Sequence, residues 1–244
     1  MGVNRLGRIA WRLRRCATLS ACCVFLTCYS TTSHAVVSTI TNLANGATIS
    51  FSALVGSNPL SLQIGDKIYG DFSYSLSGGT APLPSDLVLK AVENQFGYGF
   101  SLQMPLIATG SQFKDVVLDF SVTAPGALIS GIDLSFASSV SGHGIATIAE
   151  NVFTNGFGSG LIAALQVANP GAPTVFEDSA FFTIPQHEIW IEKDILVDGN
   201  GFCSSTDWAH ISIVDQTVSQ IPEPNTMALS VFGLIFCLFA KRRR

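Results

Sequence analysis

The side chains that most often carry enzyme chemistry are few and scattered in this 244-residue chain. Three histidines, His143, His187 and His210, follow the first 35 residues, and none has a partner at zinc-site spacing. His187-Glu188 begins like the H-E-x-x-H motif but lacks the second histidine. The glycines around Ser159 are out of phase with a G-x-S-x-G nucleophile elbow. We therefore expect no catalytic residue, no metal site and no cofactor, and a protein that is not an enzyme.

Acidic residues allow two alternatives to that expectation. The run 198–201, Asp-Gly-Asn-Gly, is similar to a Ca²⁺-binding loop, but the alternating acidic series and the closing glutamate are missing. A hairpin turn with glycine and asparagine at positive φ explains it better, and we favour the turn. Asp194 with Asp198, or Glu177 with Asp178, could still meet in a calcium site after folding. Carboxylate pairs also suggest a glycosidase, although 17 acidic residues make some plausible pair inevitable.

Aromatic residues could form a platform on which sugar rings stack. Tyr69, Tyr98 and Trp208 are the three that we would test. For the others, strand-like spacing makes packing in the core the default. Those others are Phe72, Tyr74, Phe96, Phe100 and Trp190.

Short segments of alternating polarity must position all of these side chains. In 113–123, Val116, Leu118 and Phe120 share one face, and Asp119 and Ser121 share the other. Similar segments are 47–55, 67–76, 86–92, 97–103, 128–136, 145–154, 161–167, 188–197 and 208–218. About ten short strands separated by Gly, Asn and Pro turns predict an all-β fold, a β-sandwich or jelly-roll, over residues 36–220. Segments 91–96 and 161–167 could instead be short helices.

Charge is distributed very unevenly along the chain. Every arginine lies in the first 15 or the last three residues. Residues 36–225 carry all 17 acidic residues and four lysines, a net charge of −13 that the whole-chain value of −4 conceals. Such a surface repels nucleic acid and anionic lipid, so neither is an expected partner of this part of the chain.

The N-terminus has the pattern of a secretory signal peptide. Five arginines precede residue 16, an apolar stretch follows to residue 29, and small residues precede a predicted cleavage between Ala35 and Val36. Two alternatives are lipidation of Cys22 in a lipoprotein box and an uncleaved signal anchor. After cleavage at Ala35, Cys203 is the one cysteine left in the predicted domain, so no disulfide can form within it.

The C-terminus combines three features in a fixed order. Pro222, Glu223 and Pro224 form an extended entry, because proline fixes φ and lacks an amide donor. Apolar residues 226–240 follow, a helix of about 22 Å that only marginally spans a bilayer core of roughly 30 Å. The last four residues are Lys241, Arg242, Arg243 and Arg244. This basic cluster is typical of a cytoplasmic stop-transfer end and disfavours the alternative, a buried core helix.

This C-terminal arrangement, residues 221–244, resembles the PEP-CTERM sorting signal of Gram-negative bacteria. The resemblance implies that Pro222, Glu223 and Pro224 are the recognition motif and that exosortase, a membrane transpeptidase-like enzyme, processes the chain. It also implies export through the Sec translocon, cleavage by signal peptidase, a transient membrane anchor, and a host that makes exopolysaccharide. The expected destination is the outer surface or the extracellular matrix.

The predicted domain is also similar to a recurrent module of PEP-CTERM proteins. The similarity rests on three short motifs: 65–69 with 72–74, the alternating Gly-Ala-Ile-Glu series that ends at Glu150, and Lys193-Asp194-Ile195. It implies a fold and no reaction. We expect a structural or carbohydrate-contacting domain, with a polysaccharide-active enzyme and a Ca²⁺-dependent adhesion module as the alternatives.

Overall fold

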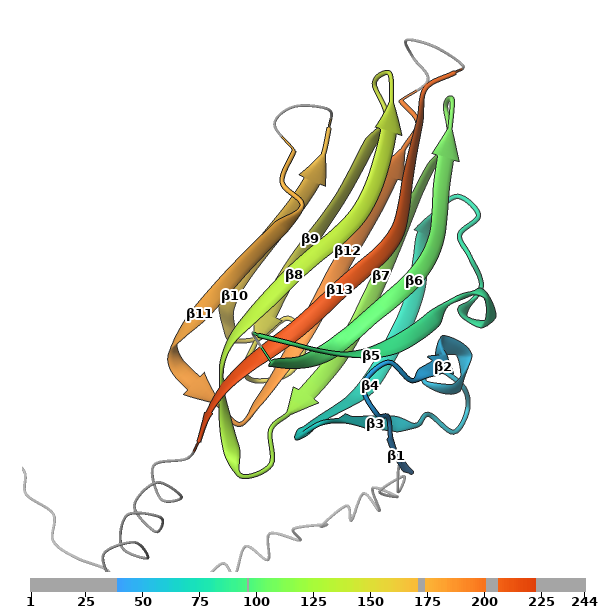
Figure 1. Ribbon diagram of the computed structural model, residues 1–244. Coiled ribbons are helices and arrows are strands. Elements are labelled where there is room, and N and C mark those ends of the chain that lie inside the picture. Colours follow the sequence, from blue (N-terminus) through green and yellow to red (C-terminus); the bar gives the residue numbers. More distant parts are fainter. Residues whose placement is uncertain (1–38, 96, 171–173, 201–205, 223–244) are drawn as a thin grey trace, which may run out of the picture. The chain divides into compact units, whose positions relative to one another are not determined.

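The computed structural model describes residues 39–95, 97–170, 174–200 and 206–222. These residues form two β-sheets that pack face to face, with short 3-10 helices η1 (Phe51–Ala53) and η2 (Pro84–Asp86) at the periphery (Figure 1). The strands are β1 (Ile40–Asn42), β2 (Thr48–Ser50), β3 (Ser61–Ile64), β4 (Lys67–Gly78), β5 (Val88–Asn94), β6 (Gly97–Thr109), β7 (Phe113–Thr123), β8 (Ala127–Ser141), β9 (Ile145–Phe153), β10 (Leu161–Asn169), β11 (Glu177–Gln186), β12 (Glu188–Asp198) and β13 (Trp208–Pro222).

The two sheets have seven and six strands. Sheet A has the order β1-β3-β4-β7-β12-β9-β10, and sheet B has the order β11-β8-β13-β6-β5-β2. All neighbours are antiparallel except β1 and β3. Figure 1 shows sheet B in front of sheet A. The predicted β-sandwich is therefore confirmed.

The core lies between the sheets and is built by alternation along each strand. On β7, Val116, Leu118 and Phe120 are fully buried, as the pattern predicted, and the inward residues of β8 include Ile132 and Leu134. Phe51, Tyr69, Phe72, Phe100 and Phe120 make edge, tilted and stacked ring contacts at one end. Such alternation buries one face of each strand and leaves the other for polar side chains.

Some details of the prediction were wrong. Segment 47–55 is a strand only over β2, because Phe51 and Leu54 are both buried and this spacing of three fits the 3-10 turn η1. The alternative helices at 91–96 and 161–167 are also wrong, since β5 runs to Asn94 and β10 fills the second segment. Strands β1, β3 and β11 were not predicted.

The turn at 198–201 is not a hairpin. β12 and β13 belong to different sheets, so the loop after Asp198 crosses from sheet A to sheet B. Its first residues do turn: the Asp198 side chain accepts a hydrogen bond of 2.7 Å from the amide of Asn200, whose φ is +50°. The predicted local turn is therefore present, but the tertiary structure decides that the two strands beside it do not pair with each other.

The predicted terminal signals lie outside the described residues. These signals are the signal helix, the cleavage residues Ala35 and Val36, and the whole tail after Pro222. Cys203 also lies outside the described residues. Within the described ranges, the helices present are too short and too polar to cross a bilayer.

Candidate functional site

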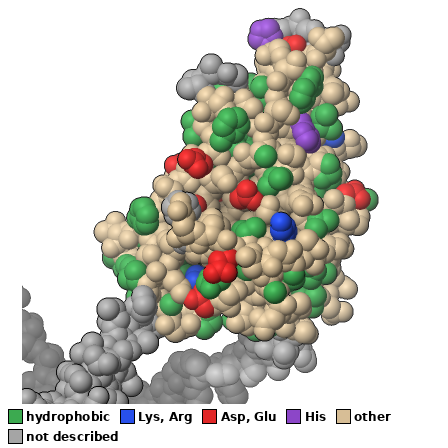
Figure 2. Space-filling view, viewed as in Figure 1, with side chains coloured by type: hydrophobic (Ala, Val, Ile, Leu, Met, Phe, Trp, Pro, Cys, Tyr) green, Lys and Arg blue, Asp and Glu red, His purple; other side chains and the backbone are tan. Residues whose placement is uncertain are grey.

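A groove of about 480 Å³ lies on the outer face of sheet B, along β11, β8 and β13. Its lining includes Asp133, Ser135, Glu177, Phe181, Asp215 and Thr217. The other residues that line it within the described part of the chain include no lysine or arginine. Figure 2 shows this face of the molecule, on which acidic side chains stand apart within a largely uncharged surface. The groove therefore presents hydrogen-bond acceptors without countercharges.

Strand register places the polar side chains of the groove in two rows. In one row Ser135 of β8 lies opposite Glu177 of β11 on one side and opposite Asp215 of β13 on the other. In the next row Asp133 lies between Ser179 and Thr217 in the same way. Residues two apart on a strand point to the same face, so both rows project outward together.

Asp133 is a partly buried carboxyl group in the middle of the groove. Burial raises the pKa of Asp133, and the negative charge of Glu177 raises it further, whereas a hydrogen bond of 3.5 Å from the Thr217 hydroxyl opposes the shift. A carboxyl group with a raised pKa gains a proton more readily than one in water. Asp133 can therefore act as an acceptor when ionised and as a donor when protonated.

Phe181 supplies the groove with an exposed aromatic ring. Phe181 is 80% exposed, whereas the next residue, Phe182, is only 8% exposed. The two side chains point to opposite faces of β11, because successive strand residues alternate. Ile184 is 71% exposed near the same edge. Exposed aromatic and aliphatic groups beside acceptors suit an amphipathic ligand.

The sequence pattern did not indicate this ring, and of the three aromatic residues that it did indicate, one is fully buried. Tyr69 is fully buried and donates a hydrogen bond of 2.8 Å to the carbonyl of Tyr98, so its proposed role as a stacking platform is wrong. The Tyr98 ring packs over Gly65, and its centroid lies 5.8 Å from Lys67 Nζ. This ring therefore makes a cation–π contact within the domain. Trp208 is half-buried at the start of β13. The adjacent pair Phe181-Phe182 could have revealed an outward ring, had β11 been identified.

The histidines and acidic residues considered as metal-binding or catalytic residues are dispersed over the domain. His143 and His187 are exposed, and His143 Nδ1 lies 3.1 Å from Asp207 Oδ2. Glu177 and Asp178 both line the groove, and Asp178 also accepts a hydrogen bond of 2.9 Å from the Gln166 amide of β10. Across the described ranges, no three His, Cys, Asp or Glu side chains are grouped as a metal site would require.

A second acidic group lies on the outer face of sheet A. Asp119 and Glu192 are register partners, and Asp194 lies one row further along β12. A hydrogen bond with Asp115, partial burial and the negative charges of Asp115 and Glu192 together raise the pKa of Asp194 to about 6. Burial also raises the pKa of Asp119, which accepts a hydrogen bond of 3.3 Å from Ser73. Hydrogen bonding, partial burial and mutual repulsion therefore account for the raised pKa values of Asp194 and Asp119.

Two of the sequence motifs meet in the core. Glu150 of β9 and Lys193 of β12 are register partners, and Lys193 Nζ bonds to Glu150 Oε2 and to Gln216 Oε1. Gln216 belongs to β13 in the opposite sheet, and its Nε2 donates a hydrogen bond of 3.0 Å to the Asp133 carbonyl. This cluster of Glu150, Lys193 and Gln216 thus links the two sheets and contacts the backbone of the groove.

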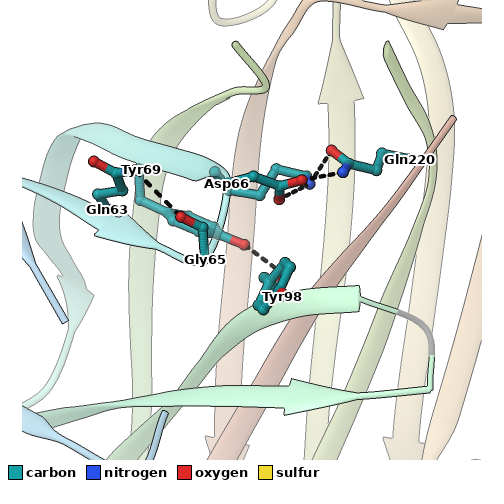
Figure 3. A network of polar contacts seen from close by, with 7 residues as sticks. Gln63, Gly65, Asp66, Tyr69, Tyr98 and Gln220 are labelled. Carbon is teal, nitrogen blue, oxygen red and sulfur yellow. Dashed lines mark hydrogen bonds and ion pairs between the residues drawn. The ribbon is translucent and has the colours of Figure 1, made fainter. Parts of the chain in front are cut away.

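The third motif forms a related link at one end of the sandwich. Lys67 Nζ bonds to Asp66 Oδ1 at 2.6 Å and to Gln220 Oε1, and Gln220 Nε2 bonds to Asp66 Oδ2 (Figure 3). Lys67 is fully buried, whereas the Asp66 side chain is 40% exposed. The hydroxyl of Tyr69 reaches the carbonyl of Tyr98 in the same region. The motif 65–69 therefore positions β3, β4, β6 and β13 against one another.

The predicted sorting motif begins where the domain ends. Pro222 is the last residue of β13 and lies opposite Ala127 of β8. Glu223, Pro224 and the basic residues Lys241, Arg242, Arg243 and Arg244 lie outside the described residues. The first residue of the predicted motif is therefore also the last residue of a central strand of sheet B.

No protein-family model and no curated protein matches this chain. Similar solved structures include the module TmCBM61 in complex with β-1,4-galactotriose, at 15% identity and TM-score 0.31, covering 60% of this chain and 88% of that one.

Two other similar structures are also carbohydrate-binding modules. One is CBM32 of AlyQ with 4,5-unsaturated mannuronic acid, at 13% identity and TM-score 0.25, covering 65% of this chain and 98% of that one. The other is a family 11 module from Clostridium thermocellum with a β-1,3-1,4-mixed-linked tetrasaccharide, at 13% identity and TM-score 0.23, covering 64% and 93%. Likeness at this level does not identify a function, which we infer below from the residues of this chain.

Proposed function

We propose that the β-sandwich is a carbohydrate-contacting domain and that the groove on sheet B is its binding surface. The observation that carries this proposal is the pairing of acceptor rows with the exposed ring of Phe181 in one groove. A sugar presents hydroxyl donors around its edge and C–H groups on its faces. Carboxylates form strong hydrogen bonds with hydroxyl donors, and an aromatic ring accepts an apolar face.

The described lining of the groove contains no basic residue, and this limits the classes of sugar that the groove can bind. Asp133, Glu177 and Asp215 would repel uronic acids, sulfated sugars and other polyanions. Neutral or amine-bearing sugars would not suffer this repulsion. We therefore infer that the ligand is a neutral or cationic polysaccharide segment.

The test is binding by the mature protein to panels of neutral, cationic and anionic polysaccharides, measured by affinity electrophoresis and calorimetry. Asp215→Ala should weaken binding by about tenfold or more, because a hydrogen bond to a charged group contributes about 1.5–3 kcal/mol. Asp194→Asn removes one charge from the opposite sheet and is the matched control. Equal affinity in all three proteins, or preference for polyanions, would contradict the proposal.

A polysaccharide-active enzyme is the second candidate, favoured by the raised pKa of Asp133 beside Glu177. The two lie on neighbouring strands one row apart, a diagonal relation that places strand residues about 7–8 Å apart. In inverting glycosidases the two carboxyl groups are about 6.5–9.5 Å apart, a separation that side chains on strand residues so placed can reach. Hydrolysis needs an acid that holds its proton at working pH, whereas binding needs only the acceptors and the ring, so we prefer binding. Release of reducing ends that Asp133→Asn abolishes would favour the enzyme instead.

We also propose that the chain is exported and sorted by exosortase to the outer surface or matrix. The support is the order of the predicted signals, together with the position of Pro222 at the end of β13. Intact mass and fractionation of the mature protein, in native hosts with and without exosortase, provide the test. We expect residues 1–35 to be lost in both hosts, and the residues after Pro224 to be lost only in the host that has exosortase. Retention of 226–244 in both hosts would make the tail a plain anchor.

A further inference from the structure

Three reactive side chains from three strands meet in the middle of the core. Lys193 of β12 bonds both to Glu150 of β9 and to the side-chain carbonyl of Gln216 of β13. The residues Lys193 and Gln216 are 0% exposed, and Glu150 is 1% exposed. The remaining hydrogen-bonding group of Gln216, its Nε2, is held by the Asp133 carbonyl at 3.0 Å. The amine, the carboxyl and the carboxamide are therefore in contact and shielded from water.

Burial changes the protonation of the pair in a direction that favours reaction. Desolvation lowers the pKa of the Lys193 amine and raises that of Glu150, while their mutual attraction opposes both shifts. Transfer of one proton from the ammonium to the carboxylate yields a neutral amine and a neutral acid, which a dry core tolerates better than two ions. Glu150 Oε1 has no hydrogen-bond partner within the described structure.

The cluster is poorly explained as a source of stability. A buried ion pair is often no more stabilising than apolar residues of the same volume, because its desolvation offsets the attraction. Its neighbours along the three strands, such as Ile191, Ile195 and Val214, are fully buried and apolar. A neutral amine held beside a carboxamide and a proton carrier is, however, the arrangement that nucleophilic acyl transfer requires.

We propose that Lys193 and Gln216 join in an intramolecular isopeptide bond, with Glu150 as the proton carrier. Lys193 and Gln216 are in direct contact across the two sheets, and water is excluded from around all three side chains. The bond would connect β12 of sheet A covalently to β13 of sheet B.

The reaction balances without an oxidant or a co-reactant. The Lys193 nitrogen attacks Gln216 Cδ, and Glu150 protonates the carbonyl oxygen. Glu150 then takes a proton from the attacking nitrogen and delivers it to the carboxamide nitrogen. The C–N bond to that nitrogen breaks, ammonia leaves, and the carbonyl re-forms as its hydroxyl proton returns to Glu150. The net change is one amine and one primary amide converted into one secondary amide and ammonia.

The proposal predicts a specific change in mass. The purified full-length product, after whatever processing the host performs, should be lighter than its sequence by about 17 Da, the mass of ammonia. Lys193→Met should remove this deficit, as should Glu150→Gln if that variant folds. If neither variant folds, the wild-type mass and the tryptic digest of the wild-type protein together still test the proposal, because the digest shows whether residue 193 is joined to residue 216.

Tryptic digestion of the denatured protein provides an independent readout. Trypsin needs a free lysine side chain, so the Lys193-Asp194 bond should remain uncut. Lys114-Asp115 has the same sequence and should be cut, which makes it an internal control. Lys67 is a second control: it also contacts a glutamine, but its acidic partner Asp66 is 40% exposed to water. Tandem mass spectrometry should then find residues around 193 joined to residues around 216.

Each other outcome overturns the proposal. An unchanged mass with normal cleavage after Lys193 means that the cluster is only a buried ion pair. A loss of about 18 Da with residue 193 joined to residue 150 means that Glu150, not Gln216, is the acyl group. A loss of ammonia that persists in Lys193→Met means ring closure at an Asn-Gly pair, of which 45–46, 155–156 and 200–201 are examples.

Discussion

Gln216 and Gln220 lie four residues apart on β13, and each accepts a hydrogen bond from a buried lysine of the opposite sheet. Lys193 reaches the first glutamine from β12, and Lys67 reaches the second from β4. An acidic residue completes each cluster, Glu150 in the core and Asp66 near the surface. The two sheets are therefore connected by oriented polar contacts as well as by apolar packing.

Gln220→Leu should lower the free energy of unfolding by about 1–3 kcal/mol, because Lys67 and Asp66 each lose a hydrogen-bond partner near the protein interior. Urea denaturation at neutral pH measures the effect. Gln103→Leu, on the exposed outer face of β6, is the control and should change stability by no more than about 0.5 kcal/mol. Equal effects of the two substitutions would show that the Lys67 cluster contributes nothing specific.

Phe181→Ala and Phe182→Ala should have opposite consequences although the residues are adjacent. Phe181→Ala removes an exposed ring, so it should weaken polysaccharide binding about threefold to tenfold and leave the melting temperature unchanged. Phe182→Ala creates a cavity and should lower the free energy of unfolding by about 3 kcal/mol. Calorimetric binding and thermal melts of both variants make the comparison. A large loss of stability in Phe181→Ala would contradict the outward orientation.

Asp194 should make the protein more stable as the pH falls from 7 toward 4. Its pKa is about 6 in the folded state against 3.8 ordinarily, so the folded state binds more protons in this window and gains stability on acidification. Asp194→Asn removes the repulsion from Asp115 and Glu192. It should raise the melting temperature by about 2 °C at pH 7.5, a small effect because solvent screens an exposed group, and by nothing at pH 4. A pH-independent difference would contradict this account.

Gly65→Ala should destabilise the domain more than Gly46→Ala. Both glycines have positive φ, +60° and +81°, so both substitutions carry backbone strain of about 1 kcal/mol. Only at Gly65 would the added Cβ overlap a side chain, the ring of Tyr98, whereas nothing lies within 4 Å at Gly46. Melting temperatures of the two variants separate the steric effect from the strain. Equal losses would mean that the Tyr98 ring can move aside.

The sequence by itself determined the class of this fold. Alternation with period two along segments such as 113–123 and 128–136 identifies strands and their buried faces, because each strand residue projects to one side or the other of its own sheet. The alternation did not predict strands whose formation depends on tertiary packing. The edge strand β11 contains Pro185 and a register shift against β8, and neither its pairing nor its outward ring is encoded by alternation alone.

Only the tertiary structure decided which strands are neighbours, and therefore which side chains form a site. Asp133, Glu177 and Asp215 are far apart in the chain and become adjacent because β11, β8 and β13 pair in one register. Glu150 and Lys193 meet for the same reason, and Gln216 joins them only because the second sheet packs on the first. Periodicity reports the face to which a residue points. It carries no information about the partner strand, since hydrogen-bonding groups of the backbone are the same at every residue except proline.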